Sequence, residues 1–207
     1  MALVQTTYPT TALAVNGPNQ DTVEFFKASG CRRYAEIGVY EGDTTLEIAA
    51  HLAGEGEIHL FDFEDRVADV AARLGRAGHN NVVGHGNSRR LMDSYNWSLM
   101  RLLHEHEQPL FDYVFLDGAH TWGQDALAFL LADRLLVPGG YVDFDDYWWT
   151  LARSPSMNPA AFPPTSKLYT EEQIEERHVA LVIDLLVRRD SRYEELVANK
   201  IFRKAKT

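Results

Sequence analysis

The chain contains 207 residues, a length that suits one domain around a single hydrophobic core. Hydrophobic residues make up 45% of it and charged residues 24%, proportions typical of a globular protein and not of a disordered one. The formal net charge is −10, whereas proteins that bind a nucleic-acid backbone usually carry a basic face, so nucleic acid is not the expected partner. The single cysteine, Cys31, excludes an internal disulfide and a cysteine-rich zinc site.

The first residues do not have the pattern of a targeting segment. MALVQTTYPTTALAV lacks the basic start and the continuous apolar run of a signal peptide, and no stretch approaches the roughly 18 apolar residues of a membrane span. We therefore expect a cytoplasmic protein with no membrane partner. Residues 1–17 show no periodicity and are expected to form an N-terminal arm, and residues 1–207 as a whole are expected to form one domain.

Short apolar runs alternate with helical patterns along most of the chain. Asn19 or Asp21 is positioned to cap a first helix, which Gly30 ends. Strands are then expected at 32–39, 57–63, 81–84, 111–118 and 141–147. Helices are expected between them at 43–53, 65–77, 90–107 and 123–135, with a turn at the VPGG of residues 137–140. This repeated β-α order implies parallel strands joined by right-handed crossovers.

The C-terminal part of the chain is less regular. Prolines break any helix across residues 148–169, a segment long enough to suggest a lid, a substrate loop or a dimer contact rather than a spacer. A long helix is expected over roughly 170–189, followed by two short strands near 192–197 and 199–205 that pair as an antiparallel hairpin. The sequence thus predicts an α/β protein with a doubly wound, mostly parallel, seven-stranded Rossmann-like sheet and an antiparallel edge hairpin.

The first strand runs into EIGVYEG, residues 36–42, at the sheet edge where α/β proteins bind ligands. Gly38 permits a tight turn, and Gly42 permits a ligand or a helix to approach the backbone. The turn lacks the third glycine and the lysine of phosphate-binding loops, so a dinucleotide or a triphosphate fits less well. Glu36 at its start suits a cofactor with a cationic amino group, and an ordinary strand–helix turn is the alternative interpretation.

Polar residues also follow the next two strands. Asp62 lies about 20 residues beyond the glycine turn, where an acid can hold ribose hydroxyls. Glu64 and Asp65 lie beside it, so Asp62 is alternatively one of several solvated loop acids. Asn87 and Ser88 follow the third strand and are candidates to contact an adenine edge, although Gly-Asn-Ser is also common in turns. Three such sites at successive strand ends favour one cofactor over three unrelated turns.

The fourth and fifth strands both end in acids. Asp117 closes the fourth, and Asp145 and Asp146 close the fifth, so neighbouring strand ends bring three carboxylates together. Three converging carboxylates repel one another and require protonation, a basic partner or a cation. Mg²⁺ prefers oxygen ligands and keeps waters that a substrate diol can replace, which makes these acids a candidate metal site. The alternative is that one of the adjacent pair points into solvent.

His120 lies three residues beyond Asp117. Either His120 or Asp117 is a candidate to accept the proton of a hydroxyl, and His120 is alternatively a residue that only orients Asp117. The aromatic residues at 147–149, with Trp122, are candidates for an apolar wall over an acceptor, or for ordinary core. Arg153 and Lys167 are candidates to hold an anionic acceptor, with isolated surface cations as the alternative. His104 and His106 are expected to be solvated.

Taken together, YAEIGVYEGDTTLEIA, LFDFED, FLDGAHTWGQD and LLVPGGYVDFDDY resemble the class I S-adenosylmethionine-dependent methyltransferases. The similarity is to the group that includes macrocin-type sugar O-methyltransferases and cephalosporin-hydroxylase-like proteins, and it covers roughly residues 20–150. The resemblance implies that Glu36, Gly38 and Gly42 line the methionine end of the cofactor, that Asp62 holds the ribose, and that Asn87 and Ser88 lie near the adenine. Tyr40 and Asp117 complete the expected cofactor-binding set. The resemblance also implies Mg²⁺ at the matching acids, Asp117, Asp145 and Asp146.

The expected function is therefore Mg²⁺-assisted methyl transfer from S-adenosylmethionine to a hydroxyl of a small metabolite, such as a natural-product sugar. The resemblance to this family also allows the chain to form a homo-oligomer. A same-fold enzyme of another class, such as a hydroxylase-like protein or an N-methyltransferase, is the first alternative. A non-catalytic module that binds the cofactor is the second.

Overall fold

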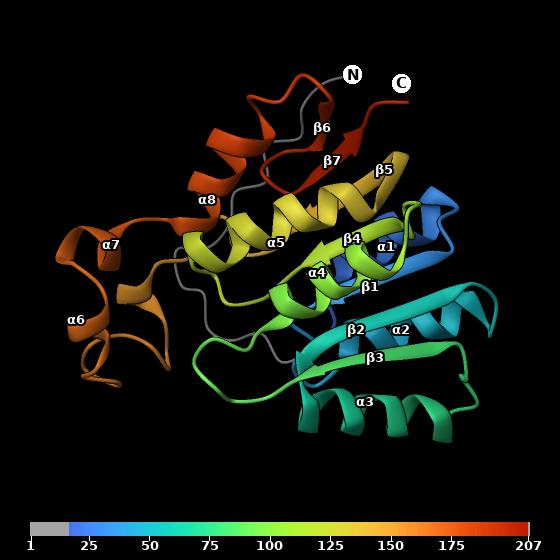
Figure 1. The fold of residues 1–207 in the computed structure, drawn as a ribbon, viewed down its shortest axis with the longest axis horizontal. Helices are drawn as coiled ribbons and strands as arrows, with labels where there is room; N and C mark the ends of the chain where they lie inside the picture. The colour runs from blue at the N-terminus through green and yellow to red at the C-terminus, as the bar shows by residue number, and fades with distance from the viewer. Residues whose placement is uncertain (1–16, 207) are drawn as a thin grey trace.

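The computed structural model describes residues 17–206, so all but the last residue of the expected arm at 1–17 lies outside the described part (Figure 1). Seven strands form one sheet in the order β3-β2-β1-β4-β5-β7-β6. Strands β1 to β5 pair in parallel, and β7 is antiparallel to both β5 and β6, which confirms the predicted sheet with its edge hairpin. The strands are β1 Arg33–Ile37, β2 Glu57–Phe63, β3 Val82–Asn87, β4 Phe111–Leu116, β5 Leu136–Phe144, β6 Tyr193–Val197 and β7 Ile201–Lys204.

Helices cover both faces of the sheet. The helices are α1 Gln20–Ser29, α2 Asp43–Leu52, α3 Glu64–Arg76, α4 Tyr95–Glu105, α5 Trp122–Leu135, α6 Thr165–Leu168, α7 Glu171–Glu175 and α8 His178–Val182. Asn19 caps α1, as expected, because its side chain accepts a hydrogen bond from the Thr22 amide. Within residues 17–206, no helix is both long and apolar enough to cross a membrane.

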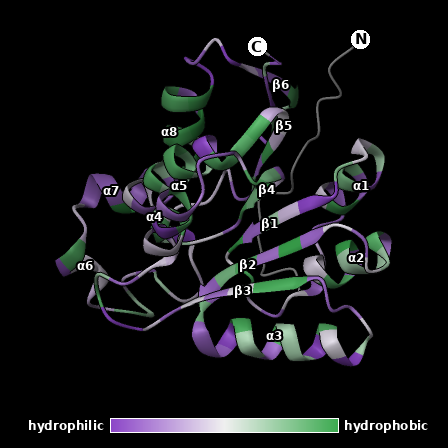
Figure 2. Ribbon diagram, turned by 45° about the vertical axis from the view of Figure 1, so that its right-hand side comes forward, coloured by the Kyte–Doolittle hydropathy of each residue, from purple (hydrophilic) through white to green (hydrophobic). Residues whose placement is uncertain are grey.

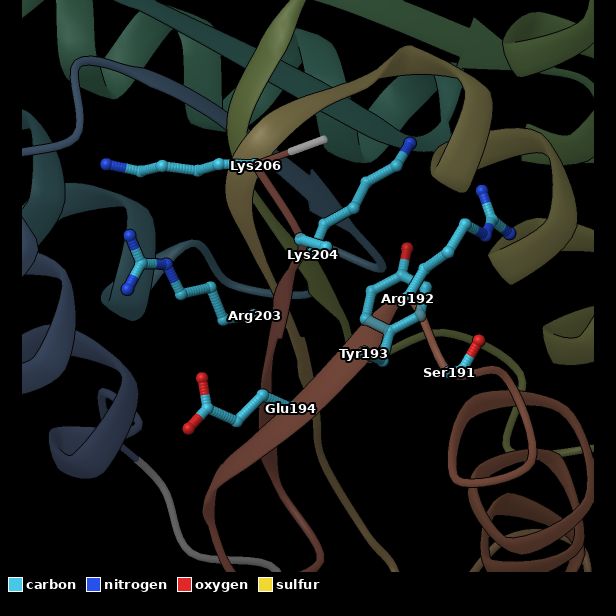
Figure 3. A pocket seen from close by; sticks show the side chains of 8 residues that line it. Ser191, Arg192, Tyr193, Glu194, Arg203, Lys204 and Lys206 are labelled. Carbon is cyan, nitrogen blue, oxygen red and sulfur yellow. The ribbon is translucent and has the colours of Figure 1, made fainter.

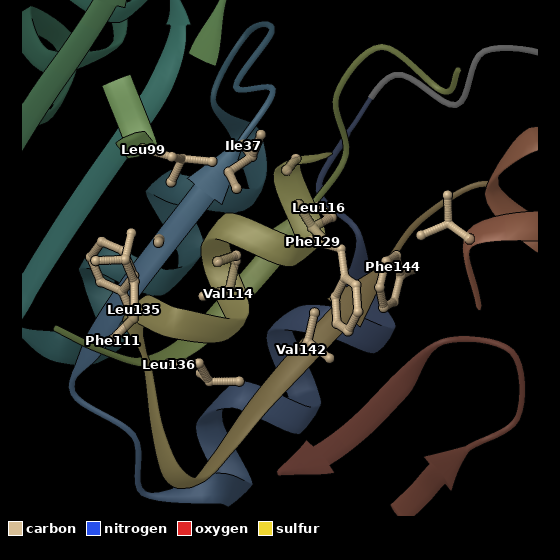
Figure 4. Close-up of a cluster of buried hydrophobic side chains, with 14 of the residues drawn as sticks. Ile37, Leu99, Phe111, Val114, Leu116, Phe129, Leu135, Leu136, Val142 and Phe144 are labelled. Carbon is tan, nitrogen blue, oxygen red and sulfur yellow. The ribbon is translucent and has the colours of Figure 1, made fainter. Parts of the chain in front are cut away.

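The core has two layers because strand side chains alternate between the faces. Ala35 and Ile37 of β1 face a cluster built with α4, α5 and α8, part of which Figure 4 shows. Tyr34 of the same strand faces the opposite cluster with α1, α2 and α3. Hydrophobic and hydrophilic residues alternate along α3 (Figure 2), whose buried Val67 and Val70 are spaced for one helical face. The two layers leave the ends of the parallel strands free to carry loops.

The predicted turn at 137–140 is wrong, because the VPGG segment lies inside β5. Gly139 has a φ of +83°, and the pairing of β4 with β5 shifts register between Phe111 and Tyr113. The glycine conformation and the irregular register accommodate Pro138, which has no N–H to donate, without ending the strand. The third strand also runs further than predicted, to Asn87.

The predicted continuous helix over 170–189 is also wrong. It divides into α7 and α8, and α8 runs on into a π-helical turn at Ile183–Val187. The interruption lies at Glu176 and Arg177, whose ψ angles of 151° and 89° are not helical. The predicted irregular segment 148–169 contains two short turns of helix, at Leu151–Arg153 and in α6. Figure 1 shows α6, α7 and α8 on the side of the sheet where α5 begins.

Candidate active site

The carboxyl ends of the parallel strands form one edge, and the backbone holds them together beyond the strands themselves. The amide of Asp117 donates to the carbonyl of Ile37 over 2.8 Å, and the amide of Asp145 donates to the carbonyl of Leu116 over 3.0 Å. The loops after β1, β4 and β5 therefore leave the sheet from fixed positions. This edge is where an open α/β sheet binds its ligand.

Two glycines shape the loop after β1 in different ways. Gly38 has a φ of +88°, and a Cβ on it would overlap the carbonyl oxygen of Asp117. Gly42 has a φ of +76°, and a Cβ on it would overlap the side chain of Val70 in α3. Helix α3 is therefore one close neighbour of Gly42, as the sequence allowed. Gly38 in turn lets the loop pass directly against the end of β4.

Glu36 is buried at the end of β1, with 2% of its surface exposed. Its Oε2 accepts a hydrogen bond of 2.5 Å from the Thr45 hydroxyl in α2 and one of 3.2 Å from the Tyr34 hydroxyl. Burial raises the pKa of Glu36 to about 8, although both hydroxyls act in the opposite direction. An adjacent cation would favour the ionised form, so a cationic amino group as its ligand is consistent with this environment and stays a prediction.

Asp62 is not one of several solvated acids, because it is buried and accepts hydrogen bonds from the glycine loop. Its Oδ2 accepts from the amides of Val39, over 2.9 Å, and Tyr40, over 3.0 Å. Its Oδ1 accepts from the amide of Phe63 over 2.6 Å. A carboxylate has about four lone-pair sites, so capacity remains for ribose hydroxyls. Asp62 thus joins the end of β2 to the loop after β1.

The loop after β3 contains a buried polar atom without a partner. Asn87 is 7% exposed, and its Oδ1 has no hydrogen-bond partner among the described residues. The amide and hydroxyl of Ser88 both donate to Oδ2 of Asp93, over 2.7 and 2.6 Å. Sequence reasoning missed Asp93, for which the only signal was an acid shortly after a Gly-Asn-Ser turn. The unpartnered acceptor of Asn87 fits a ligand that presents a donor, as the amino group of an adenine does.

The loops after β4 and β5 bring two of the three predicted acids together with the predicted histidine. Nε2 of His120 lies 3.8 Å from Oδ1 of Asp117 and 3.5 Å from Oδ2 of Asp146. All three residues are partly buried, and one potential ligand atom from each lies within 4.8 Å of the others. We call Asp117, His120 and Asp146 the acid–histidine cluster. Asp145 is not part of this cluster, but its charge raises the pKa of both Asp117 and Asp146.

The electrostatics of the acid–histidine cluster disfavour its charged acids. Burial raises the pKa of Asp117 well above its ordinary value, and the charges of Asp145 and Asp146 add to this. Burial and Asp145 likewise raise the pKa of Asp146, which His120 opposes. The site therefore resists holding all its carboxylates ionised without positive charge, as the sequence predicted. A divalent cation with oxygen ligands is one chemically suitable source of that charge.

Three residues at this edge adopt the left-handed backbone conformation that side chains disfavour. The φ angles are +48° for Tyr40, +52° for His120 and +59° for Asp146. Each such residue costs on the order of 1–3 kcal/mol and persists only where the surrounding structure enforces it. Local strain of this kind concentrates at functional sites, and here it occurs on three separate loops of one edge.

Two residues that the sequence did not indicate support the loop that carries His120. The hydroxyl of Tyr95 donates to Oδ1 of Asp125 over 3.0 Å and accepts from the amide of Ala119 over 3.2 Å. Burial raises the pKa of Asp125 to about 6. The charge of His120 and hydrogen bonds from the amides of Ala119 and His120 act in the opposite direction and lower it. A Cβ on Gly118 would lie 2.7 Å from the Tyr95 hydroxyl, so the loop sits directly on this pair.

A buried lysine supplies positive charge to the same region. Nζ of Lys200, which is 5% exposed, lies 3.0 Å from Oδ1 of Asp143. Oδ2 of Asp143 accepts 2.7 Å hydrogen bonds from the hydroxyls of Thr22 and Tyr113. The charge of Lys200 lowers the pKa of Asp117, against the larger effect of burial. Lys200 thus supplies some of the positive charge that the sequence allowed for, but its direct partner is Asp143, and its position before a strand of the C-terminal hairpin gave no sign of this role.

The aromatic residues at 147–149 and Trp122 differ in their surroundings, and their role as a wall over an acceptor stays a prediction. The Trp149 ring lies 5.2 Å from that of His120, centroid to centroid. Trp148 is 47% exposed and packs edge-on against Tyr147, and Trp122 is 53% exposed. These exposed indoles are not core residues. Arg153 has an interaction within the protein, while Lys167 is exposed on α6. His104 and His106 are exposed, as predicted.

The surface also has hollows away from the acid–histidine cluster. One of about 330 Å³, lined by residues of β6 and β7 and by the residues just before β6 and just after β7, is drawn in Figure 3. It includes Lys204, whose Nζ donates to the carbonyl of Leu136 at the start of β5, so it lies at the amino end of the parallel strands. A second hollow of about 370 Å³ borders Tyr40 and Arg66, beside the glycine loop. The first hollow is therefore not part of the candidate site.

Comparison with known proteins agrees with this geometry. A family model described as a methyltransferase domain matches residues 35–147. Comparison with curated proteins finds no match. Among solved structures, an O-methyltransferase from Bacillus cereus in complex with S-adenosylhomocysteine is 18% identical, covers 96% of this chain and 84% of its own, and has a TM-score of 0.63. TomG from Streptomyces achromogenes, an O-methyltransferase of tomaymycin synthesis bound to S-adenosylmethionine, is 20% identical, with coverages of 93% and 82% and a TM-score of 0.62.

An rRNA methylase from Streptococcus thermophilus also matches, at 14% identity, coverages of 93% and 99%, and a TM-score of 0.54. At such identities the likeness concerns the fold, which methylases of different acceptors share. The family match spans more than half of the chain and includes β1, the glycine loop and the acids after β4 and β5. The chain therefore belongs to the methyltransferase-domain family and is a class I S-adenosylmethionine-dependent methyltransferase.

Proposed function

We propose that the protein transfers the methyl group of S-adenosylmethionine to a hydroxyl oxygen of a small molecule, with the assistance of Mg²⁺. The observation that carries this proposal is the acid–histidine cluster. It lies on the loops after β4 and β5, at the same sheet edge as the glycine loop after β1. Methyl transfer to oxygen requires a positioned hydroxyl and an acceptor for its proton. The cluster offers both oxygen ligands and two candidate proton acceptors within one small region.

The loops after β1, β2 and β3 provide the proposed cofactor site. Glu36, with Gly38, Tyr40 and Gly42, borders the methionine end, where the amino group is cationic. Asp62 faces the ribose, and Asn87 and Ser88 face the adenine. The unpartnered Oδ1 of Asn87 and the buried acid Glu36 are complementary to a donor and to a cation, respectively, which supports this orientation. Asp117 borders both this site and the acceptor.

Asp117, Asp145 and Asp146 are the proposed ligands of Mg²⁺. The raised pKa values of Asp117 and Asp146 support a cation here, because burial raises both, the charges of Asp145 and Asp146 further raise that of Asp117, and the charge of Asp145 further raises that of Asp146. When bound, the ion would lower the pKa of a ligated acceptor hydroxyl. Either His120 or Asp117 then accepts the hydroxyl proton, and Trp149 beside His120 limits access of water to it.

The acceptor is proposed to be a small molecule, with a natural-product sugar as the class suggested by the resemblance. The formal charge of −10 supports a small molecule over RNA, although an rRNA methylase shares the fold. TomG supports the natural-product context, because its structure is described as that of an O-methyltransferase of tomaymycin synthesis. A homo-oligomer and a cytoplasmic location stay predictions.

Calorimetry with S-adenosylmethionine and S-adenosylhomocysteine tests the cofactor part. We expect binding by the native chain and at least a tenfold loss of affinity in Asp62→Asn. Asp65→Asn is the matched control, because Asp65 is an exposed acid only three residues further along, in the first turn of α3. No heat with either compound would refute the proposal. Equal affinity in both variants would remove Asp62 from the site.

Radiolabelled methyl transfer to a panel of hydroxyl compounds tests the reaction. We expect turnover that a chelator abolishes and Mg²⁺ restores. Turnover unaffected by the chelator would refute the metal, and cofactor binding without turnover on any hydroxyl or amine would favour a non-catalytic module. Transfer to amines alone would assign an N-methyltransferase.

A further inference from the structure

Arg177 occupies the interruption between α7 and α8, and its position is fixed by the next residue. His178 is 1% exposed, and its Nδ1 accepts a 3.2 Å hydrogen bond from the amide of Trp122. Its Nε2 bonds to the carbonyl of Gln173 over 2.7 Å. Trp122 begins α5 only two residues after His120. The backbone at Arg177 is therefore tied to the loop that carries the acid–histidine cluster.

The guanidinium of Arg177 lies over the rings of Trp148 and Tyr147, which pack edge-on against each other. Its Cζ is 4.9 Å from the ring centroid of Trp148 and 5.6 Å from that of Tyr147. Trp149, the next residue after Trp148, has its ring centroid 5.2 Å from that of His120, so these aromatic residues connect Arg177 to the acid–histidine cluster. Stacking on rings uses the flat face of a guanidinium and leaves the N–H groups in its plane free to donate.

Arg177 has no carboxylate partner among residues 17–206, although the chain is rich in acids. Within those residues its guanidinium makes no hydrogen bond, while its backbone amide donates to Glu176 and its carbonyl accepts from the amide of Leu181. Arg188 provides the contrast, because it also lies over the Tyr147 ring, 5.7 Å away, yet pairs with Asp184 and Glu195. Arg177 and Arg188 thus both lie over the Tyr147 ring, but only the guanidinium of Arg188 is paired with carboxylates.

We infer that Arg177 binds a carboxylate carried by the methyl acceptor. The fork of a guanidinium matches a carboxylate through two parallel hydrogen bonds. The acids of the cluster would repel an anionic acceptor, and Arg177 is placed to offset that repulsion at the border of the site. An acceptor that bears both a hydroxyl and a carboxylate is the kind of molecule that contacts both. This assignment rests on the proposed methyl transfer and narrows its substrate class to hydroxy acids.

Two matched pairs of acceptors test the assignment by kcat/KM. They are 3,4-dihydroxybenzoate against catechol, and methyl glucuronoside against methyl glucoside. We expect the native enzyme to favour the carboxylate member of at least one pair. Arg177→Ala should lower kcat/KM for that member about 10- to 100-fold and for its neutral counterpart less than threefold. Arg177→Lys, which keeps the charge but not the fork, should be intermediate.

Arg189→Ala is the control for bulk charge. Arg189 is exposed and lies 12 positions further along the chain, past α8, so its removal should leave both acceptors unchanged. A native preference for the neutral members, or equal losses for both members in Arg177→Ala, would overturn the assignment. Thermal unfolding of each variant separates a loss of folding from a loss of binding.

A binding measurement covers the case of no turnover with these probes. In the presence of S-adenosylhomocysteine, each probe is titrated while tryptophan fluorescence is recorded, because Trp148 lies under the guanidinium. We expect 3,4-dihydroxybenzoate or the glucuronoside to bind at least tenfold more tightly than its neutral counterpart, and only with Arg177 present. No such preference would refute the role of Arg177 while leaving cofactor binding intact. Failure to bind S-adenosylhomocysteine would instead refute the proposed function.

Discussion

Nε2 of His120 lies 3.5 Å from Oδ2 of Asp146, although the two residues are 26 positions apart and both have a positive φ. This relationship joins the loop after β4 to the loop after β5 and places an imidazole among carboxylates. We predict that His120→Gln lowers kcat for methyl transfer about 10²- to 10⁴-fold, the usual contribution of a general base, and changes S-adenosylhomocysteine affinity less than threefold. His104→Gln, at an exposed position, is the control. A kcat within threefold of the native value would leave Asp117 as the proton acceptor.

The acids should govern the metal response. We expect Asp146→Asn to raise the Mg²⁺ concentration for half-maximal activity at least tenfold, because a carboxylate ligand is replaced by a weaker neutral one. Asp145→Asn tests the remaining acid, whose charge raises the pKa of both neighbours but whose ligand atoms fall outside the cluster. Activity titrated with Mg²⁺ after chelator treatment measures both. An unchanged Mg²⁺ response in both variants contradicts the metal site.

Cofactor binding should release protons at neutral pH. The pKa of Glu36 is raised to about 8, so at pH 7 its carboxyl is mostly protonated before binding. A cationic amino group nearby favours the carboxylate, so binding drives the proton off and the affinity should rise between pH 6 and 8. Calorimetry in two buffers of different ionisation enthalpy measures the released proton. Glu36→Gln should bind without this release, and identical heats in both buffers for the native chain would contradict the prediction.

Stability should fall on the acid side of neutrality because of a histidine pair. Nδ1 of His59 lies 2.9 Å from Nε2 of His85, and burial together with His59 lowers the pKa of His85 from 6.5 to about 4. The folded state thus prefers neutral His85, so its contribution is complete above pH 6.5 and is lost as the pH falls toward 4. Lowering the pH from 7 to 5 should cost about 1–2 kcal/mol of unfolding free energy through this group.

Urea unfolding at both pH values measures this loss. His85→Phe keeps a ring that can stack on Phe61, which is 4.4 Å from the present imidazole, but removes its titration. The pH dependence should shrink in that variant and persist in His104→Phe, at an exposed position. If the free energy of unfolding fell equally with pH in the native chain, His85→Phe and His104→Phe, the pairing of His59 with His85 would not govern stability in acid.

Gly38 and Gly123 should respond in opposite directions to alanine. In Gly38→Ala the new methyl overlaps the Asp117 backbone at a φ of +88°, so we expect a loss of several kcal/mol of stability or no folded protein. Nothing lies within 4 Å of a Cβ on Gly123, which is in α5, so Gly123→Ala should be neutral or stabilise by about 0.5–1 kcal/mol. Thermal and urea unfolding compare them, and a tolerated Gly38→Ala would contradict the close approach of the two loops.

The sequence predicted those features that depend on neighbours in the chain. Asn19 caps α1, and Asp62 and Asp117 sit at strand ends, because short-range patterns determine caps, strands and turns. The support of Tyr95 and Asp125 beneath the His120 loop was not predicted, since it depends on a pair 30 residues apart. The contact of Thr22 with Asp143 spans 121 residues and leaves no local pattern.

The errors have the same origin. Residues 170–189 have helical periodicity throughout, but the bonds of His178 to Trp122 and Gln173 outweigh the local preference and end α7 early. Pro138 and Gly139 indicate a turn by themselves, but the pairing of Leu136 and Tyr141 on either side of them with β4 incorporates them into a strand instead. Tertiary contacts thus decided both segments, and one of those contacts positions Arg177.

The pairing of Lys200 with buried Asp143 has a consequence for the order in which the molecule forms. During synthesis all five parallel strands are made before Lys200 is reached, so until then Asp143 lacks its cation. Burying a carboxylate without a cation is costly, and removing one partner of such a pair typically costs about 3–5 kcal/mol. Docking of β5 is therefore disfavoured until the C-terminal hairpin has been synthesised. The candidate active-site edge is then completed at the same time as the sheet.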